Sequence, residues 1–328
     1  MKIKKSRINE CLSELKHKRI AVIGDLMLDE YLIGSVSRIS PEAPVPVVDI
    51  KEESLRFGGA ANVCLNLSTL GAIPVPFGVI GNDDAGNQFI EEAKRFHFSI
   101  DGVIVSDTRM TTVKTRVIGS NQQIVRIDKE VKTPILSSTE DQLLGQLKTH
   151  IQTLDAVIFQ DYNKGVITQR VIKEGISICK AHNVPVFVDP KFSNFFEYTH
   201  VTLFKPNKAE ASVALSEELS TMDDYKSACK ALKEKLSASH ILITLSAEGM
   251  LLLTDENQFV HIPTKAVEVA DVSGAGDTVI STLVAMIVGG ATLTEATILA
   301  NEAAGIVVTE VGIIPITQEQ LIDTGENV

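Results

Sequence analysis

Residues 271–278, with the sequence DVSGAGDT, have the types and spacing that most clearly suggest chemistry. Two glycines around an alanine, just before a helix-like apolar run at 279–288, let backbone N–H groups surround a small anion where a helix dipole favours negative charge. A carboxylate there cannot bind the anion, because two negative groups repel each other. Asp277 is therefore a candidate general base beside an anion hole. The amides of three residues would form this hole: Gly274, Ala275 and Gly276. A glycine turn capped by Asp or Ser is the structural alternative.

A second glycine-rich stretch, FGGAAN at 57–62, opens a helix-like segment at 63–70. The paired glycines Gly58 and Gly59 would let a ligand approach the backbone closely, and the Asn62 amide offers both a donor and an acceptor to hydroxyl groups. A glycine-softened helix start explains the same residues without any ligand. The stretch is consistent with a site for a hydroxylated ligand.

The apolar run at 19–25 is typical of a buried parallel strand, and it ends at Asp25. In open α/β sheets, ligands gather at the carboxyl ends of the strands. Asp25 and Asp29 are therefore placed to bind the hydroxyls of a polyol. A turn or cap aspartate is the alternative for both.

From residue 138 onwards, helix-like and strand-like segments alternate. Three units share this pattern: 138–152 with 156–159, 168–182 with 184–188, and 221–237 with 241–245. The alternation predicts a parallel sheet with helices on both faces. Polar clusters lie near the strand ends, at 161–165, 189–191 and 205–210. Strands that deliver Asp, Lys, Asn and Glu to one rim suggest a phosphoryl-transfer site, with Asp161 and Lys164 as candidates for substrate binding.

Two segments break this alternation and are expected to form a small β-lid, at about 33–57 and 103–128. The first alternates prolines with small or β-branched residues, which suits an edge strand or an extended excursion. The second is rich in Thr, Val and Ile around a short connection at 119–122, which is typical of a β-hairpin. Three basic residues would bring positive charge to the lid and suit an anionic substrate: Lys114, Arg116 and Arg126. Solvated charges on a strand face are the alternative.

The composition narrows the class of protein. With 328 residues, 44% of them hydrophobic, we expect a single domain over residues 1–328. The formal net charge of −11 argues against a nucleic-acid or membrane-surface binder. The four cysteines are scattered, so neither a zinc site nor a disulfide framework is indicated. No segment has the roughly 18 uninterrupted apolar residues of a membrane span, and we expect a cytoplasmic protein. Walker, protein-kinase, Rossmann and G-x-S-x-G patterns are absent.

Three motifs occur in order along the chain: GGAAN at 58–62, NKAE at 207–210 and DVSGAGDT at 271–278. Together they resemble the ribokinase-like (PfkB) family of sugar kinases, over almost the whole chain. Three more stretches, at 38–48, 114–118 and Asn121 to Gln123, resemble kinases of D-glycero-D-manno-heptose 7-phosphate, enzymes of bacterial ADP-heptose synthesis. The resemblance implies a three-layer, doubly wound α/β fold with a mostly parallel sheet and a β-lid.

The resemblance also implies a role for individual residues in an ATP-dependent kinase. Asp277 would be the base, and the amides of 274–276 would hold the transferring phosphoryl group. Sugar hydroxyls would be bound by Asp25, Gly58, Gly59 and Asn62. The nucleotide pocket would be lined by Thr244, Ser246, Gly249 and Asn301. Asn207 and Glu210 would order Mg²⁺ and its waters. The candidates for the phosphate already on the sugar are Lys114, Arg116, Arg126 and Lys164.

The sequence departs from the pattern of the family at two places. Val272 and Ser273 replace a common Thr-Thr pair, with little expected effect because the backbone does the binding. Many relatives continue into a nucleotidyltransferase domain, whereas this sequence stops at Val328, so a separate adenylyltransferase is expected. A homodimer through the lid is expected. A kinase for another sugar or sugar phosphate, and a non-catalytic nucleotide- or sugar-binding regulator, are the alternatives. A monovalent cation beside Asp271 stays open.

Overall fold

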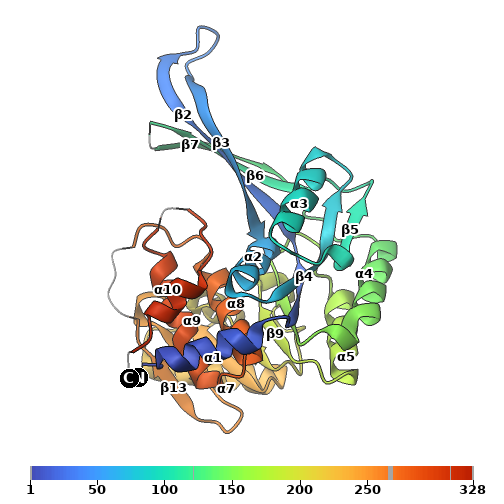
Figure 1. Ribbon diagram of the computed structural model, residues 1–328, viewed down its shortest axis with the longest axis vertical. Helices are drawn as coiled ribbons and strands as arrows, with labels where there is room; N and C mark the ends of the chain where they lie inside the picture. The colour runs from blue at the N-terminus through green and yellow to red at the C-terminus, as the bar shows by residue number, and fades with distance from the viewer. Residues whose placement is uncertain (1, 121, 265–268, 311, 327–328) are drawn as a thin grey trace.

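The main sheet of the computed structural model has nine strands, in the order β13-β12-β11-β10-β9-β8-β1-β4-β5 (Figure 1). The structure describes residues 2–120, 122–264, 269–310 and 312–326. Neighbouring strands from β11 to β5 are parallel, whereas β12 and β13 are antiparallel at the edge. This confirms a mostly parallel sheet. Its strands are β1 (Arg19–Gly24), β4 (Ile73–Gly81), β5 (Val103–Ser106), β8 (Ala156–Gln160), β9 (Val186–Asp189), β10 (Leu203–Phe204), β11 (His240–Thr244), β12 (Met250–Leu253) and β13 (Phe259–Ile262).

Helices cover both faces of this sheet (Figure 1). Within the described ranges, none is both long and apolar enough to cross a lipid bilayer. The helices are α1 (Lys5–Leu15), α2 (Ala60–Leu70), α3 (Asp84–Arg95), α4 (Ser137–His150), α5 (Gln169–Ala181), α6 (Lys208–Leu215), α7 (Met222–Leu236), α8 (Ala275–Val288), α9 (Leu293–Val307) and α10 (Gln318–Asp323).

Side chains alternate along β1 between two separate hydrophobic cores. Ile20 and Val22 pack with buried residues of α1, α2, α8 and α9. Ala21 and Ile23 point to the opposite face and pack with α4, α5 and α7. Because successive strand residues face opposite sides of a sheet, both faces of β1 are buried. The expected three-layer, doubly wound architecture is confirmed.

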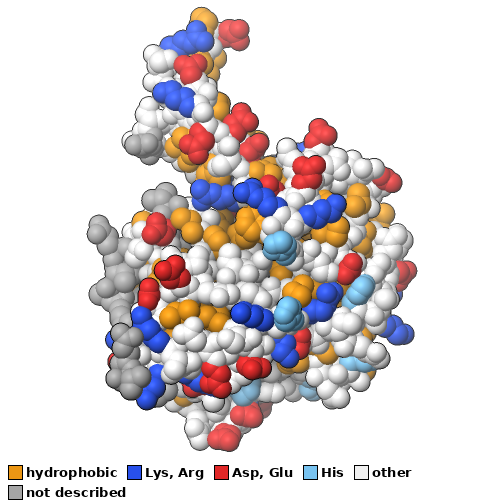
Figure 2. All heavy atoms as spheres, viewed as in Figure 1, with side chains coloured by type: hydrophobic (Ala, Val, Ile, Leu, Met, Phe, Trp, Pro, Cys, Tyr) orange, Lys and Arg blue, Asp and Glu red, His pale blue; other side chains and the backbone are white. Residues whose placement is uncertain are grey.

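A second, four-stranded sheet forms the lid, in the order β3-β2-β6-β7. Its strands are β2 (Leu26–Ile39), β3 (Pro46–Gly59), β6 (Thr112–Gly119) and β7 (Gln122–Lys129). The lid projects from the body, and its surface carries basic, acidic and hydrophobic side chains close together (Figures 1 and 2). Because β2 begins two residues after β1 ends, the base of the lid lies above the carboxyl ends of the parallel strands.

The lid differs from the expected boundaries of 33–57 and 103–128. β2 starts at Leu26 and β3 continues to Gly59, so the lid begins earlier in the chain. Residues 103–106 do not belong to it, because β5 pairs with β4 and buries Ile104 in the core of the body. The expected hairpin is confirmed as β6 and β7. Asn121, in its connection, lies outside the described residues.

Candidate active site

Asp277 lies in the first turn of α8, three residues after the N-cap Gly274. Gly274 has φ of 82°, a left-handed conformation that favours glycine, and this bend leads the chain into the helix. The Asp277 side chain is buried, and three uncharged groups donate hydrogen bonds to its carboxylate. Asn62 Nδ2 lies 2.7 Å from Oδ2, whereas Tyr162 OH and Gln160 Nε2 lie 2.5 and 3.2 Å from Oδ1.

The environment of Asp277 prepares it to take a proton near neutral pH. Burial raises the pKa of its carboxyl to about 6, although the hydrogen bonds from Tyr162 and Asn62 act in the opposite direction. Asp189 raises the pKa further and Lys205 lowers it. A base works best when its pKa lies near the operating pH, so this carboxylate is suited to general-base catalysis.

The helix terminus beside Asp277 offers an anion site that differs in one respect from the expected one. The Ala275 N–H donates to the Val272 carbonyl at 3.3 Å, so this amide already has an acceptor. Gly276 occupies a first-turn position, where helix N–H groups have no intrahelical acceptor. A Cβ on Gly276 would lie 3.8 Å from Asp189 Oδ2 and 4.0 Å from Lys205 Nζ, and these two side chains form an ion pair at 3.0 Å. The turn at Gly276 therefore places its amide beside the Asp189–Lys205 ion pair.

A pocket of about 770 Å³ opens in front of this terminus, a size typical of small-molecule sites. Its lining includes the cations Lys191, Lys205 and Lys208, together with the carboxylates Asp189, Glu218 and Asp277. Six of the residues predicted for catalysis, nucleotide or metal line it: Asn207, Thr244, Ser246, Gly274, Gly276 and Asp277.

Two residues predicted for the nucleotide are not among those that line this pocket. Gly249 lies in the turn between β11 and β12, where a Cβ would come within 2.0 Å of the Ile262 carbonyl oxygen, so the position requires glycine for packing. Asn301, on α9, accepts from the Thr264 hydroxyl at 3.0 Å and donates to the Pro263 carbonyl at 3.2 Å. Both lie against the end of β13 and the residues that directly follow it, 262–264.

Asn207 and Glu210 form a capping box at the start of α6. Asn207 Oδ1 accepts the Glu210 N–H at 2.8 Å, and Glu210 Oε2 accepts the Asn207 N–H at 2.9 Å. Glu210 is buried, and its other oxygen accepts from the Lys191 ammonium group. The N-x-x-E motif therefore has a structural role at the rim of the pocket.

These residues fit a magnesium ion in one mode of binding. In the described part of the chain, no three His, Cys, Asp or Glu side chains gather as a metal site. Mg²⁺ usually keeps several waters and takes only one or two protein carboxylates beside substrate phosphates. Asn207 lines the pocket and suits contact with the ion's water shell. Glu210 is only 2% exposed and is not among the lining residues, so it holds Asn207 and Lys191 at the rim.

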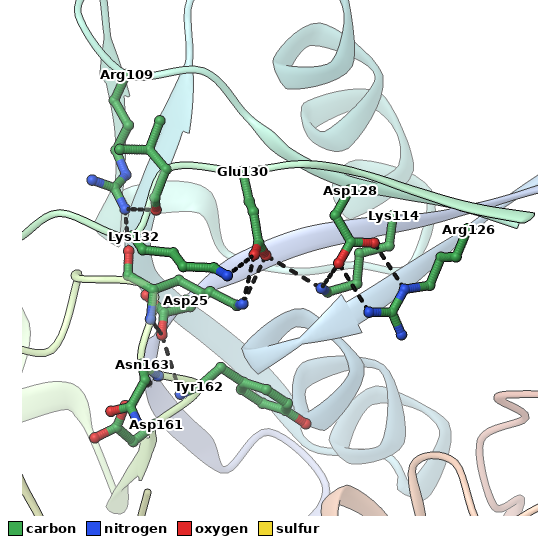
Figure 3. A network of polar contacts seen from close by, with 12 residues as sticks. Asp25, Arg109, Lys114, Arg126, Asp128, Glu130, Lys132, Asp161, Tyr162 and Asn163 are labelled. Carbon is green, nitrogen blue, oxygen red and sulfur yellow. Dashed lines mark hydrogen bonds and ion pairs between the residues drawn. The ribbon is translucent and has the colours of Figure 1, made fainter. Parts of the chain in front are cut away.

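Asp25, predicted to bind sugar hydroxyls, has a different place in the structure. It is only 2% exposed, and its oxygens accept backbone N–H groups from the loop at 161–166 (Figure 3). These donors are Tyr162 at 3.1 Å, Lys164 at 3.0 Å and Val166 at 3.1 Å. Asp25 therefore shapes the 161–166 loop rather than the pocket. Asp161 is similarly buried, and accepts from the Asn163 N–H and from the Tyr198 hydroxyl at 2.9 Å.

The other predicted sugar ligands gather at the base of the lid. Asp29 is buried on β2 and forms an ion pair with Arg116. Gly58 lies on the neighbouring strand β3, opposite Met27, where a Cβ would be 2.2 Å from Asp29 Oδ2. Gly59 is the N-cap of α2. Asn62, in the first turn of that helix, is directed to Asp277 rather than to open solvent. Asp271, which precedes the start of α8, accepts the N–H groups of Ser273 and Gly312.

The four predicted phosphate-binding cations are already paired with carboxylates, and Figure 3 shows the pairs of Lys114 and Arg126. Arg126 is half-exposed and pairs with Asp128 at 2.9 Å. Lys114 lies between Asp128 at 3.4 Å and Glu130. Glu130, directly after β7, has a side chain only 8% exposed and pairs with three ammonium groups: Lys114 at 3.3 Å, Lys132 at 3.0 Å and Lys164 at 2.7 Å.

Sequence reasoning missed four residues that hold the site together: Gln160, Tyr162, Asp189 and Lys205. All lie at or just after strand ends, inside or next to the polar clusters at 161–165, 189–191 and 205–210. Their positions in or beside these polar clusters were the sequence feature that could have indicated a role in the site. Gln160 and Tyr162 donate to Asp277, which lies more than a hundred residues further along the chain, whereas Asp189 and Lys205 act on it through their charges.

A family model described as pfkB family carbohydrate kinase matches residues 17–320. The chain belongs to the pfkB family of carbohydrate kinases. It is thus an ATP-dependent sugar kinase, and the expected ribokinase-like fold is confirmed. The kinase is 40% identical to the bifunctional protein HldE of Pelobacter propionicus over 316 residues, which are 96% of this chain and 65% of that protein. It is 42% identical to HldE of Helicobacter pylori strain J99, over 90% of this chain and 64% of that protein. The kinase spans a little under two thirds of the length of these relatives.

Solved structures share the fold. Ribokinase from Arabidopsis thaliana, complexed with ribose and ATP, matches with a TM-score of 0.73 and 18% identity, over 94% of this chain and 98% of the other. Phosphofructokinase-2 from Escherichia coli, in complex with potassium, matches with a TM-score of 0.76 and 16% identity, over the same shares.

Proposed function

We propose that this kinase transfers the γ-phosphoryl group of ATP to the anomeric hydroxyl of D-glycero-D-manno-heptose 7-phosphate. The product would be the 1,7-bisphosphate, an intermediate of ADP-heptose and lipopolysaccharide core synthesis. One observation carries the proposal: the buried Asp277 carboxylate lies at a helix N-terminus beside a pocket with three lysines in its lining. The stretches at 38–48 and 114–118, which resemble heptose 7-phosphate kinases, support the choice of sugar.

The proposed reaction gives a role to each of several groups around the pocket. Asp277 takes the proton of the anomeric hydroxyl, and the hydroxyl oxygen forms a bond to the γ-phosphorus while the bond to the bridging oxygen of ADP breaks. The Gly276 amide and Lys205 are placed to offset the charge on the transferring group. Bound Mg²⁺ would neutralise charge on the ATP phosphates, with Asn207 in contact with its water shell and Glu210 holding Asn207 at the rim.

The phosphate already on the sugar would be bound by cations at the base of the lid. Lys114, Lys164 and Arg116 are well shielded candidates, with side chains only 15%, 16% and 18% exposed, whereas Arg126 is 51% exposed. A substrate phosphate would compete with Asp29 and Glu130 for these cations. Because that phosphate does not react, its binding energy can place the anomeric hydroxyl against Asp277.

We further propose that two copies of the kinase pair through their lids. Several hydrophobic side chains on the lid are open to solvent, including Ile39 at 62%, Val45 at 50% and Ile127 at 55% exposure. β3 and β7 are the edge strands of the lid sheet, so they can extend it or pack against a second lid. A symmetric pair would cover these side chains.

The test of the proposed function is an ADP-release assay with purified kinase, ATP and Mg²⁺, over a panel of heptose, hexose and pentose phosphates and unphosphorylated heptose. The expected result is the highest kcat/KM for D-glycero-D-manno-heptose 7-phosphate. A higher value for another sugar would assign the kinase to that substrate instead. ATP binding without turnover of any sugar would support a regulatory role.

A further inference from the structure

We propose that Tyr162 is a positioning residue whose hydroxyl holds the Asp277 carboxylate so that Oδ2 is the oxygen that receives the substrate proton. This inference rests on the proposed function only in taking Asp277 as the general base. The Tyr162 hydroxyl makes the shortest of the three hydrogen bonds to Asp277, at 2.5 Å. None of the sequence motifs assigned a role to this side chain.

The two oxygens of Asp277 have unequal surroundings. A carboxylate oxygen can accept about two hydrogen bonds. Oδ1 accepts from both Tyr162 and Gln160, so its capacity is filled within the described residues. Oδ2 accepts from Asn62, which leaves one lone pair on that oxygen for a substrate hydroxyl. Without the Tyr162 hydroxyl, the two oxygens would become nearly equivalent and the carboxylate could turn about its side-chain bond.

Tyr162 can hold Asp277 because its own backbone is fixed. Asp25 accepts the N–H groups of Tyr162, Lys164 and Val166, so a single buried carboxylate fixes the 161–166 loop at three points. Arg109 adds further bonds, to the carbonyls of Val131 and Lys164 (Figure 3). A hydroxyl on a fixed loop restricts the partner carboxylate more than one on a mobile side chain would.

The direction of this hydrogen bond is settled by the neighbouring charges. Burial and the nearby Asp277 raise the pKa of the Tyr162 hydroxyl, so it keeps its proton and donates. The other charged groups that act on Asp277 are Asp189, Lys205 and Lys191. They remain in place when Tyr162 is changed. Loss of the hydroxyl should therefore raise the pKa of Asp277, because a donor that favours its charged form is removed.

The experiment compares Tyr162→Phe with Tyr198→Phe. Tyr198 is a matched control, because its hydroxyl also donates to an aspartate of the same loop, Asp161, at 2.9 Å. In Tyr162→Phe, the acid limb of the kcat profile should move up by about one pH unit, the order expected for one lost charge-assisted hydrogen bond. At the plateau, kcat should fall about ten-fold while KM for ATP changes less than two-fold. Tyr198→Phe should lower Tm without moving the acid limb.

A second measurement does not depend on turnover. In protein labelled with ¹³C-aspartate, the carboxyl resonance of Asp277 is identified by its loss in Asp277→Asn, and its titration midpoint should rise in Tyr162→Phe alone. An unchanged midpoint and acid limb, or equal shifts in Tyr198→Phe, would overturn the proposal. If the wild-type kinase turned over no sugar in the panel, the proposed function would fail, and the titration would still decide whether Tyr162 controls Asp277.

Discussion

The groups in direct contact with the Asp277 carboxylate suit a general base, because they orient it without forming an ion pair with it. Its three hydrogen-bond donors, Asn62, Gln160 and Tyr162, are all uncharged. A guanidinium or ammonium group in direct contact would hold the pKa of the carboxyl well below its usual range and weaken it as a base. Lys205 instead pairs directly with Asp189. The carboxylate thus keeps a defined orientation and a proton affinity suited to neutral pH.

At this scale we expect Asp277→Asn to abolish turnover while leaving ATP affinity nearly unchanged. The amide preserves the shape but cannot accept the proton, and loss of general-base help typically costs about 10²–10⁴ in rate. Single-turnover rates and ATP titrations with the purified variant check this. A variant that kept more than about a tenth of the wild-type rate would remove Asp277 from the role of base.

The pH dependence of the wild-type kinase follows from the same residue. Burial raises the pKa of Asp277 to about 6, and the base acts only when deprotonated. With ATP and sugar saturating, kcat should therefore rise through about pH 6 and level off above it. A rate profile from pH 5 to 8 measures this. A flat profile down to pH 5 would mean that proton removal by Asp277 does not limit the rate.

The alternation of helices and strands was predictable because it depends on local hydrophobic patterns. Segments such as 156–159 and 241–245 coincide closely with β8 and β11. The two-residue β10 was too short to give a pattern, and β4 carries Pro74 and Pro76, which are unusual within a sheet. For the site, the motifs predicted Asp277 as the base, and this stays a prediction. The partners of Asp25 and Asn62 could not be predicted, since they lie far along the chain.

The capping box of α6 allows a sharp test of the magnesium proposal. Glu210→Gln should raise the Mg²⁺ concentration for half-maximal rate more than it raises KM for the sugar, because the amide can still cap the helix but loses the charge. Glu295→Gln is the matched control, since Glu295 occupies the same position in the capping box of α9 and pairs with Arg7. An Mg²⁺ titration that responds alike in both variants would leave Glu210 with a structural role only.

The lid cations can be tested by comparing phosphorylated and unphosphorylated heptose. Arg116→Ala and Lys164→Ala should each lower kcat/KM for the sugar phosphate by about ten-fold or more, as expected for one lost charged hydrogen bond. Unphosphorylated heptose should respond far less. Lys132→Ala is the control, because Lys132 also pairs with Glu130 but is 68% exposed. Equal losses on both sugars would mean that the phosphate is recognised elsewhere.

On the scale of the whole molecule, the lid buries fewer hydrophobic side chains than the body does. Every residue of β7 is exposed, whereas the strands at the centre of the main sheet are buried on both faces. The lid sheet covers the strand ends and leaves hydrophobic side chains open to solvent. Such a surface suits an interface with a second copy of the chain.

We therefore expect the kinase to be a dimer, with a mass near twice 35.5 kDa by light scattering. Ile127→Lys on the lid should shift it towards the monomer, because the lysine would be buried in the pair. Val105→Lys on β5 is the control, with 56% exposure against 55% for Ile127. A wild-type monomer at micromolar concentration, or dissociation in both variants, would argue against pairing through the lid.

The buried Asp25 also affects the order in which the molecule can fold. Its bonds to the 161–166 loop join residues 137 to 141 positions apart in sequence. Contacts across such long separations form late, because the chain must first lose the entropy of closing a large loop. β1 and β8 must already be adjacent before the Asp25 carboxylate can meet these amides. Pairing of β1 with β8 should therefore precede fixation of the loop that carries Tyr162, and enzymatic activity should not return before that pairing has formed.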